Sequence, residues 1–375
     1  PGVAPHIKES LMRRTGAKVL FLIVVFAMIA AACSSDDDSG SSEDGSIWVL
    51  LPDSASSARW ETDDRRFFEG AFDEAGVEYN IVNAEGDPVQ QQAQAEQAIA
   101  DGAAVILLVN LDSASGAAII NIAREGGAAV IDYDRLTIEG PGADVYVSFD
   151  NVAVGRTMSE SVTPAIDALG LAEVRLALLN GGPTDNNSKL FKEGYTEEVE
   201  ARVASGEWVV VADEDTPDWD NQEALRIYEQ MLVANNNEID ATFAANDGLA
   251  NSVISARKSA GLNPIPLSGQ DATVAGMQNV LSGWQTMSVY KPIKAEAEAA
   301  AAVALALLRG EAVDSVSGDW ELITINNGTN DLPYVALTPV GVTKDNVAET
   351  VIADGFRTWD EICVGEFEEF CPADR

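Results

Sequence analysis

An acid and a guanidinium stand side by side just after an apolar stretch of the chain stops. The stretch is Ala-Ala-Val-Ile at 128–131, and Asp134 and Arg135 follow it after an Asp-Tyr pair. A short apolar run of this kind is typical of a buried parallel strand, and ligands of open α/β sheets bind beyond the carboxyl ends of the strands. An aspartate that accepts and an arginine that donates in a fixed fork can hold adjacent hydroxyl groups. An ion pair without a ligand explains this stretch alone equally well.

Hydrogen-bonding and aromatic side chains also follow the other apolar runs. The candidate ligand-binding residues are Arg59, Trp60, Asp134, Arg135, Asn187, Trp219, Asn246, Asp271 and Lys291. Planar polar groups make paired hydrogen bonds to neighbouring hydroxyls, and indole faces cover the C–H faces of a sugar ring. The sequence has no P-loop and no G-x-G-x-x-G motif, which a phosphate or dinucleotide site would need. The pattern therefore predicts a neutral, polyhydroxylated ligand.

Several other polar residues have simpler explanations. Asn151 fits the cap of the helix that follows it, and Asp185 and Asn186 fit a turn. The acidic segment 213–220 lacks the spacing and the glycine of an EF-hand, so we interpret it as a solvated loop.

The composition argues against enzyme chemistry and against nucleic acid. The only histidine is His6, in a segment that we expect to be removed, which excludes Ser-His-Asp and Cys-His catalysis and the commonest transition-metal ligand. We therefore expect no catalytic residue, no metal site and no cofactor. The formal net charge is −38 at pH 7, and a surface this acidic repels nucleic-acid phosphates.

Residues 1–32 are interpreted as a leader. Residues 1–11 precede Met12, the expected start, and basic residues then precede an apolar run at 19–29, as in a secretory signal. That run is shorter than the ~20 residues that a membrane span needs. Its ending, Ala-Ala-Ala-Cys, resembles a bacterial lipoprotein signal, which implies that Cys33 is lipidated. The Ser-, Asp- and Gly-rich residues up to 46 predict a disordered tether, 33–46.

A regular alternation of strands and helices must position the candidate residues. Strands are expected at 47–51, 79–82, 105–109, 128–131 and 145–149, and again at 174–179, 208–211, 241–245, 265–268 and 286–290. Helical segments such as 113–125 separate them, and an Ala-rich helix is expected at 293–308. This alternation predicts parallel sheets with right-handed crossovers. Two series of strands predict an α/β protein with two doubly wound lobes. Short β-type pieces at 322–325 and 334–337 and a helix at 344–354 are expected to cross back between the lobes.

The two cysteines after Cys33 are Cys363 and Cys371. In an exported protein they predict one local disulfide, which would staple a tail of residues 356–375. Two thiols without a nearby histidine are a poor zinc site.

Seven short pieces carry a family resemblance over about residues 47–308. SSARW, YDR, SFDN, GGPTDNN, AND, SGQDA and VYKP occur in this order, and they resemble the type I periplasmic sugar-binding proteins of ABC importers. The xylose-binding branch and the multiple-sugar-binding proteins are the most similar groups. The resemblance implies two lobes joined by a three-crossing hinge: residues 47–149 with 291–322, and residues 150–290 with 323–355.

The resemblance also implies roles for the candidate residues. Arg59 would donate to the sugar, Trp60 would line the cleft and Trp219 would stack on the ring. Asp134 and Arg135 would hold hydroxyls or the ring oxygen. The polar ring would be completed by Asn187, Asn246, Asp271 and Lys291.

The function that this implies is capture of a monosaccharide outside the cytoplasm. We expect a monomeric lipoprotein, anchored through Cys33, that delivers D-xylose to an ABC permease; glucose, galactose and arabinose are alternative ligands. A sensor that presents the bound aldose to a membrane receptor would have the same fold. A glycosidase needs two carboxylates that flank the scissile bond, and Asp134 and Asp271 are already explained as hydroxyl ligands. A sugar-responsive repressor is disfavoured because no helix-turn-helix precedes residue 47.

Overall fold

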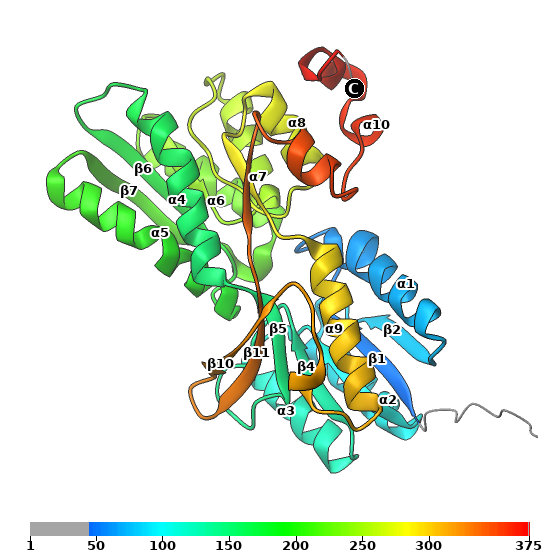
Figure 1. Ribbon diagram of the computed structural model, residues 1–375. Coiled ribbons are helices and arrows are strands. Elements are labelled where there is room, and N and C mark those ends of the chain that lie inside the picture. Colours follow the sequence, from blue (N-terminus) through cyan, green and yellow to red (C-terminus); the bar gives the residue numbers. More distant parts are fainter. Residues whose placement is uncertain (1–44, 374) are drawn as a thin grey trace, which may run out of the picture. The chain divides into compact units, whose positions relative to one another are not determined.

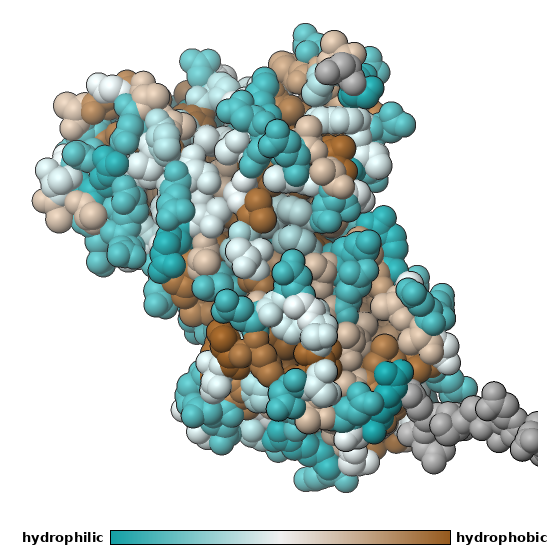
Figure 2. Space-filling view, in the orientation of Figure 1, coloured by the Kyte–Doolittle hydropathy of each residue, from teal (hydrophilic) through white to brown (hydrophobic). Residues whose placement is uncertain are grey.

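The computed structural model describes residues 45–373 and 375 (Figure 1). The expected leader, the expected lipidation site Cys33 and nearly all of the expected tether lie outside the described residues. Within the described part of the chain, no helix combines the length and the apolar character needed to cross a membrane. Hydrophilic side chains cover much of the face shown in Figure 2, as the high acidic content of the sequence leads one to expect.

The first lobe is built on a largely parallel sheet. Its strands are β1 (Ser46–Leu51), β2 (Tyr79–Asn83), β3 (Ala103–Leu108), β4 (Ala129–Tyr133), β5 (Val145–Phe149), β10 (Glu321–Asn326) and β11 (Asp331–Leu337). They lie in the order β2-β1-β3-β4-β5-β11-β10. The hairpin partner β10 is antiparallel to β11, whereas β11 itself is parallel to β5.

Helices cover both faces of this sheet (Figure 1). The helices are α1 (Arg65–Ala75), α2 (Pro88–Ala100), α3 (Ser113–Glu125) and α9 (Ile293–Leu308). Alternate residues of β1 point to opposite faces, so Val49 packs with α1 and α9 while Leu50 packs with α2 and α3. Gly76 ends α1 in the left-handed conformation, as a C-terminal glycine commonly does.

The second lobe has a smaller sheet. Its strands are β6 (Val174–Asn180), β7 (Trp208–Asp215) and β8 (Ala241–Ala244), in the order β7-β6-β8, and the antiparallel pair β9 (Met287–Tyr290) and β12 (Val340–Thr343). Its helices are α4 (Asn151–Asp167), α5 (Asn186–Ser205), α6 (Asn221–Ala234), α7 (Asp247–Ser259), α8 (Val274–Ser282) and α10 (Trp359–Ile362).

The expected strand at 265–268 is wrong. Only an isolated bridge joins Leu267 to Thr242 there. Pro264 precedes this segment and Pro266 lies within it, and proline has no N–H to donate to a sheet. The expected helix at 344–354 is likewise reduced to the single helical turn Ala348–Ile352.

The chain passes between the lobes at 149–151, 290–293 and 337–340. The expected boundary at 322/323 needs correction, because β10 and β11 belong to the first lobe. Tyr334 of β11 pairs with Tyr146 of β5, and the alternation of side chains in such short strands does not reveal which sheet they join. We therefore define the first lobe as residues 45–149 with 293–337, and the second lobe as residues 150–290 with 340–373.

The tail packs on the second lobe. Phe356, Ile362 and Cys363 are buried against residues of α8 and β9. Cys363 is bonded to Cys371, eight residues further on, and Figure 1 shows this red C-terminal segment beside α8. The part of the chain after β12 is thus a structured element of the second lobe.

Candidate functional site

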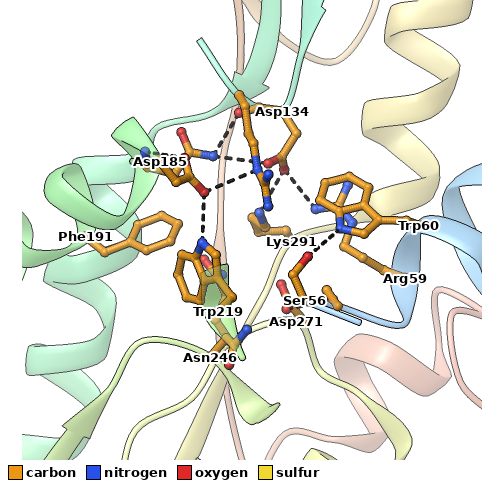
Figure 3. Close-up of a pocket in the computed structure, with 14 residues that line it drawn as sticks. Ser56, Arg59, Trp60, Asp134, Asp185, Phe191, Trp219, Asn246, Asp271 and Lys291 are labelled. Carbon is orange, nitrogen blue, oxygen red and sulfur yellow. Dashed lines mark hydrogen bonds and ion pairs between the residues drawn. The ribbon is translucent and has the colours of Figure 1, made fainter. Parts of the chain in front are cut away.

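A pocket lies between the lobes, and all nine candidate residues line it. Its empty space is about 320 Å³, including solvent at the mouth. The remaining lining residues are Ser56, Ser57, Asp185, Phe191 and Gln270. Figure 3 shows Trp60 and Arg59 approaching the pocket from one side, and Trp219 and Phe191 from the other.

Arg59 is at the centre of a buried ion network. It precedes the helical turn Trp60–Asp64 and is 2% exposed. Its guanidinium donates to both carboxylate oxygens of Asp64, at 2.8 and 2.7 Å, to Asp134 at 2.8 Å and to Glu296 at 2.8 Å. The rigid fork of an arginine suits this role, because it holds several acceptors in fixed directions.

Asp134 links the first lobe, the second lobe and the crossing segment. Its Oδ2 accepts from Arg59 and, at 2.9 Å, from Lys291, while Asn187 donates to its Oδ1 at 3.1 Å. Burial by itself would raise the pKa of Asp134, but Lys291 and Arg59 hold that pKa well below its usual range. Asp134 has a φ of 62°, a left-handed conformation that stores strain and is common at functional sites. This carboxylate is therefore a fixed, ionised acceptor.

Two acids behind Arg59 do not touch the pocket. Asp64 accepts from Tyr133 Oη at 2.6 Å, and burial raises the pKa of Asp64. Burial and the neighbouring charge of Asp134 together raise the pKa of Glu296 to about 8. The Oε1 atom of Glu296 is buried and has no hydrogen-bond partner among the described residues. A neutral Glu296 fits this unpaired atom, because an unpaired oxygen costs less when the carboxyl is uncharged.

Trp60 and Trp219 form the two aromatic walls of the pocket, and the indole nitrogen of each makes a hydrogen bond that fixes the ring. Trp60 Nε1 donates to Ser56 Oγ at 3.3 Å, and Trp219 Nε1 donates to Asp185 Oδ2 at 3.2 Å. The guanidinium of Arg135 forms an ion pair with the same Asp185 oxygen at 3.2 Å. Each indole N–H is thus satisfied at the ring edge, and the guanidinium of Arg59 lies over the Trp60 ring, 4.3 Å from its centroid.

The second lobe supplies three polar groups from strand ends and helix starts. Asn187 lies in the first turn of α5, and Asn151 donates to its Oδ1 at 2.9 Å. Asn246 caps α7 by accepting from Leu249 N, so its Nδ2 is the atom it can offer to a ligand. Asp271 follows the strand-like bridge at Gln270, has a φ of 92° and accepts from Ser57 of the first lobe at 3.2 Å.

Five of the lining residues are not among the candidates predicted from the sequence, although the sequence pattern pointed to most of them. Asp185 and Gln270 stand beside candidate residues after apolar runs, and Phe191 comes four residues after Asn187, on the same face of a helix. Gln270 Oε1 is buried without a partner among the described residues, so it is a further acceptor for a ligand. Ser56 and Ser57 carry no distinctive pattern.

The arrangement is suited to binding rather than to hydrolysis. A glycosidase needs a carboxylic acid that can protonate the leaving group. Asp134 cannot serve as that acid, because two cations depress its pKa. What the pocket offers is donors and acceptors from both lobes between two indole rings.

Comparison with known proteins agrees with this geometry. The "Periplasmic binding protein domain" family matches residues 48–312. The D-xylose-binding periplasmic protein of Escherichia coli is 35% identical over 305 residues, which are 81% of this chain and 88% of that protein. The multiple sugar-binding periplasmic protein of Azospirillum brasilense is 29% identical over 334 residues, 84% of this chain and 90% of its own length.

A solved structure shares the fold closely. It is a carbohydrate transporter solute-binding protein from Chloroflexus aurantiacus, in complex with D-glucose, with a TM-score of 0.76 and 27% identity. The match covers 84% of this chain and 97% of that one. The relatives are solute-binding proteins, so no catalytic activity is assigned to this chain. The chain belongs to the periplasmic binding protein family, in the branch that contains the D-xylose-binding proteins.

Proposed function

We propose that this protein captures a monosaccharide outside the cytoplasm, with D-xylose as the first candidate, and delivers it to an ABC permease. The observation that carries the proposal is the pocket between the lobes, in which carboxylates, amides and cations from both lobes meet between Trp60 and Trp219. A ring with several hydroxyl groups is the class of ligand that can use donors and acceptors on all sides at once.

Binding would act through closure of the lobes. Asn187 to Asp134, Arg135 to Asp185 and Ser57 to Asp271 are direct contacts between the lobes at the pocket. A sugar that bridges the same groups binds the closed form better than an open one, and therefore shifts the population toward closure. The three chain crossings are the segments about which the lobes would move.

D-xylose is favoured over other aldoses by the E. coli and Haemophilus influenzae relatives, both named as D-xylose-binding proteins. D-glucose is the second candidate, because the Chloroflexus structure holds it. The pyranose forms of these sugars differ only in the hydroxymethyl group on C5. A difference of this size in a pocket is worth roughly 10–200-fold in affinity, so direct comparison separates the two.

Isothermal titration calorimetry with D-xylose, D-glucose, D-galactose and arabinose tests the proposal. We expect D-xylose to bind most tightly and the Asp271→Asn variant to bind it at least about tenfold more weakly, because a charged acceptor is replaced by an amide. Asparagine tolerates the positive φ of this position.

Asp218→Asn is the matched control, since Asp218 has a φ of 53° but is exposed and does not line the pocket. No heat with any of the four sugars would contradict the proposal. Equal affinity of the two variants would contradict the role of Asp271.

We also propose that the protein is a monomer tethered to the membrane through a lipid on Cys33, facing outward. The support is the signal-like leader that ends in Ala-Ala-Ala-Cys. Mass spectrometry of the mature N-terminal peptide tests the anchor, and a Cys33→Ser variant recovered with an unchanged lipid mass would contradict it.

A further inference from the structure

The tail reaches back to the ligand pocket through Arg357. This residue lies outside the part of the chain that the family matches, residues 48–312. Arg357 is buried, with only 8% of its surface exposed. Its Nη1 and Nη2 donate to the two carboxylate oxygens of Asp63, each at 3.1 Å, and its Nε donates to the carbonyl oxygen of Ala272, also at 3.1 Å. The guanidinium also lies over the Phe356 ring, 3.8 Å from its centroid.

Both partners of Arg357 are neighbours of pocket residues in the sequence. Asp63 lies in the helical turn Trp60–Asp64, which begins with one of the two aromatic walls. Ala272 directly follows Asp271. The φ angles of Asp271 and Ala272 are 92° and 44°, so this turn is strained and must be held by its surroundings. The bond from Arg357 to the Ala272 carbonyl is one of the contacts that hold it.

The same guanidinium connects the two lobes. Asp63 belongs to the first lobe, whereas Ala272 and the tail belong to the second lobe. The side chains of Asp63 and Arg357 are only 3% and 9% exposed, so their ion pair is shielded from water. Arg66 also contacts Asp63, at 3.0 Å, but the Arg66 side chain is 53% exposed, and an exposed pair of this kind contributes little.

We propose that Arg357 is a positioning residue for ligand binding and a latch that holds the lobes closed. Its Nε supports the turn that presents Asp271 to the pocket, and its fork pairs with Asp63 only when the lobes meet. The inference rests on the proposed function, because it describes how the closed, sugar-bound form is retained. The latch is separate from the groups that line the pocket, so it adds to the lifetime of the closed form with any sugar that fits.

The kinetics of binding distinguish a latch from a merely structural role. A contact that forms only on closure slows dissociation and leaves association unchanged. Stopped-flow fluorescence with D-xylose and D-glucose measures both rates in Asp63→Asn, Arg357→Gln and the double variant. We expect the dissociation rate to rise about tenfold in each single variant. The double variant should add little to Arg357→Gln, because that change already removes the ion pair with Asp63 as well as the bond to the Ala272 carbonyl.

Arg66→Gln is the matched control, since it removes the exposed partner of Asp63 and should leave both rates within about twofold of the unchanged protein. Thermal unfolding without sugar checks the fold of each variant. Three results would each overturn the latch. The association rate could change as much as the dissociation rate, the effects of the two single variants could add in the double variant, or neither rate could change. If the wild-type protein binds none of the sugars, the proposed function is overturned, and the latch with it.

Discussion

The polar side chains of the pocket are already bonded to one another. Asp134 accepts from two cations and an amide, and Asp185 accepts from Arg135 and Trp219. A ligand therefore exchanges hydrogen bonds rather than simply adding them, and a sugar that lacks one hydroxyl leaves a buried group unpaired. We therefore expect this small, charged pocket to discriminate sharply between sugars.

Glu296 predicts a pH dependence of stability. Burial and Asp134 raise its pKa from 4.5 to about 8 in the folded protein, so the folded state holds a proton that the unfolded state releases. The stabilisation is complete below about pH 4.5 and is lost as the pH rises through about 8. Relative to Glu296→Gln, the unfolding free energy of the unchanged protein should fall by up to about 1.4 kcal/mol per pH unit between pH 5 and 8.

Urea denaturation of both proteins at pH 5, 6, 7 and 8 measures this difference. Glutamine keeps an oxygen for Arg59, and the comparison cancels the other acids with a raised pKa, which are Asp64, Asp132 and Asp247. A difference that does not change with pH, or that grows as the pH rises, would show that Glu296 is ionised in the folded protein.

Residues that follow strands were predictable from the sequence, whereas the acids behind them were not. Strand ends in parallel sheets converge on one edge, which is why nine polar or aromatic residues could be placed at one site. Asp64 and Glu296 lie at the start of helices, where an acid is ordinary. Only the tertiary fold places them against Arg59.

At the level of elements, a close helix crossing positions part of the pocket. Helices α4 and α5 meet at Gly155 and Gly194. A Cβ on Gly155 would lie 1.9 Å from the carbonyl oxygen of Phe191, and one on Gly194 would lie 2.1 Å from that of Val152. Because α5 carries both Asn187 and Phe191, the glycines set how near these two side chains come to the pocket.

Gly155→Ala should therefore push α5 outward. We expect a loss of about 1–3 kcal/mol in stability and weaker sugar binding, measured by thermal unfolding and calorimetry. Gly70→Ala in α1 is the control, since a Cβ there meets nothing within 4 Å and alanine stabilises a helix by up to about 1 kcal/mol. Full affinity and stability in Gly155→Ala would mean that the helices can separate without cost.

The elements themselves were predictable to different degrees. Long periodic segments such as α3 and α9 lie at the predicted bounds, 113–125 and 293–308. The lobe to which the short strands β10 and β11 belong is predicted wrongly, because strand pairing is decided by tertiary contacts that so short a pattern does not encode.

At the level of the whole molecule, the proposed function predicts that the two lobes move as units about the three crossings. Small-angle X-ray scattering should show a radius of gyration that decreases when D-xylose is added, toward the ~20 Å expected of a compact chain of this length. Asp271→Asn should show no decrease at a sugar concentration that closes the unchanged protein. An unchanged radius in both proteins would contradict closure.

The crossings also interleave the two lobes along the chain. The first lobe needs α9 for its core and β11 beside β5, yet residues 150–290 of the second lobe are synthesised in between. The lobe that begins first is therefore completed only after residue 337 has emerged, and neither lobe is one continuous stretch of chain. A ribosome or export channel that releases the chain from its N-terminus must deliver most of the protein before either lobe can close its core. The topology thus couples completion of the first lobe to synthesis of residues 293–337, after most of the second lobe has been made.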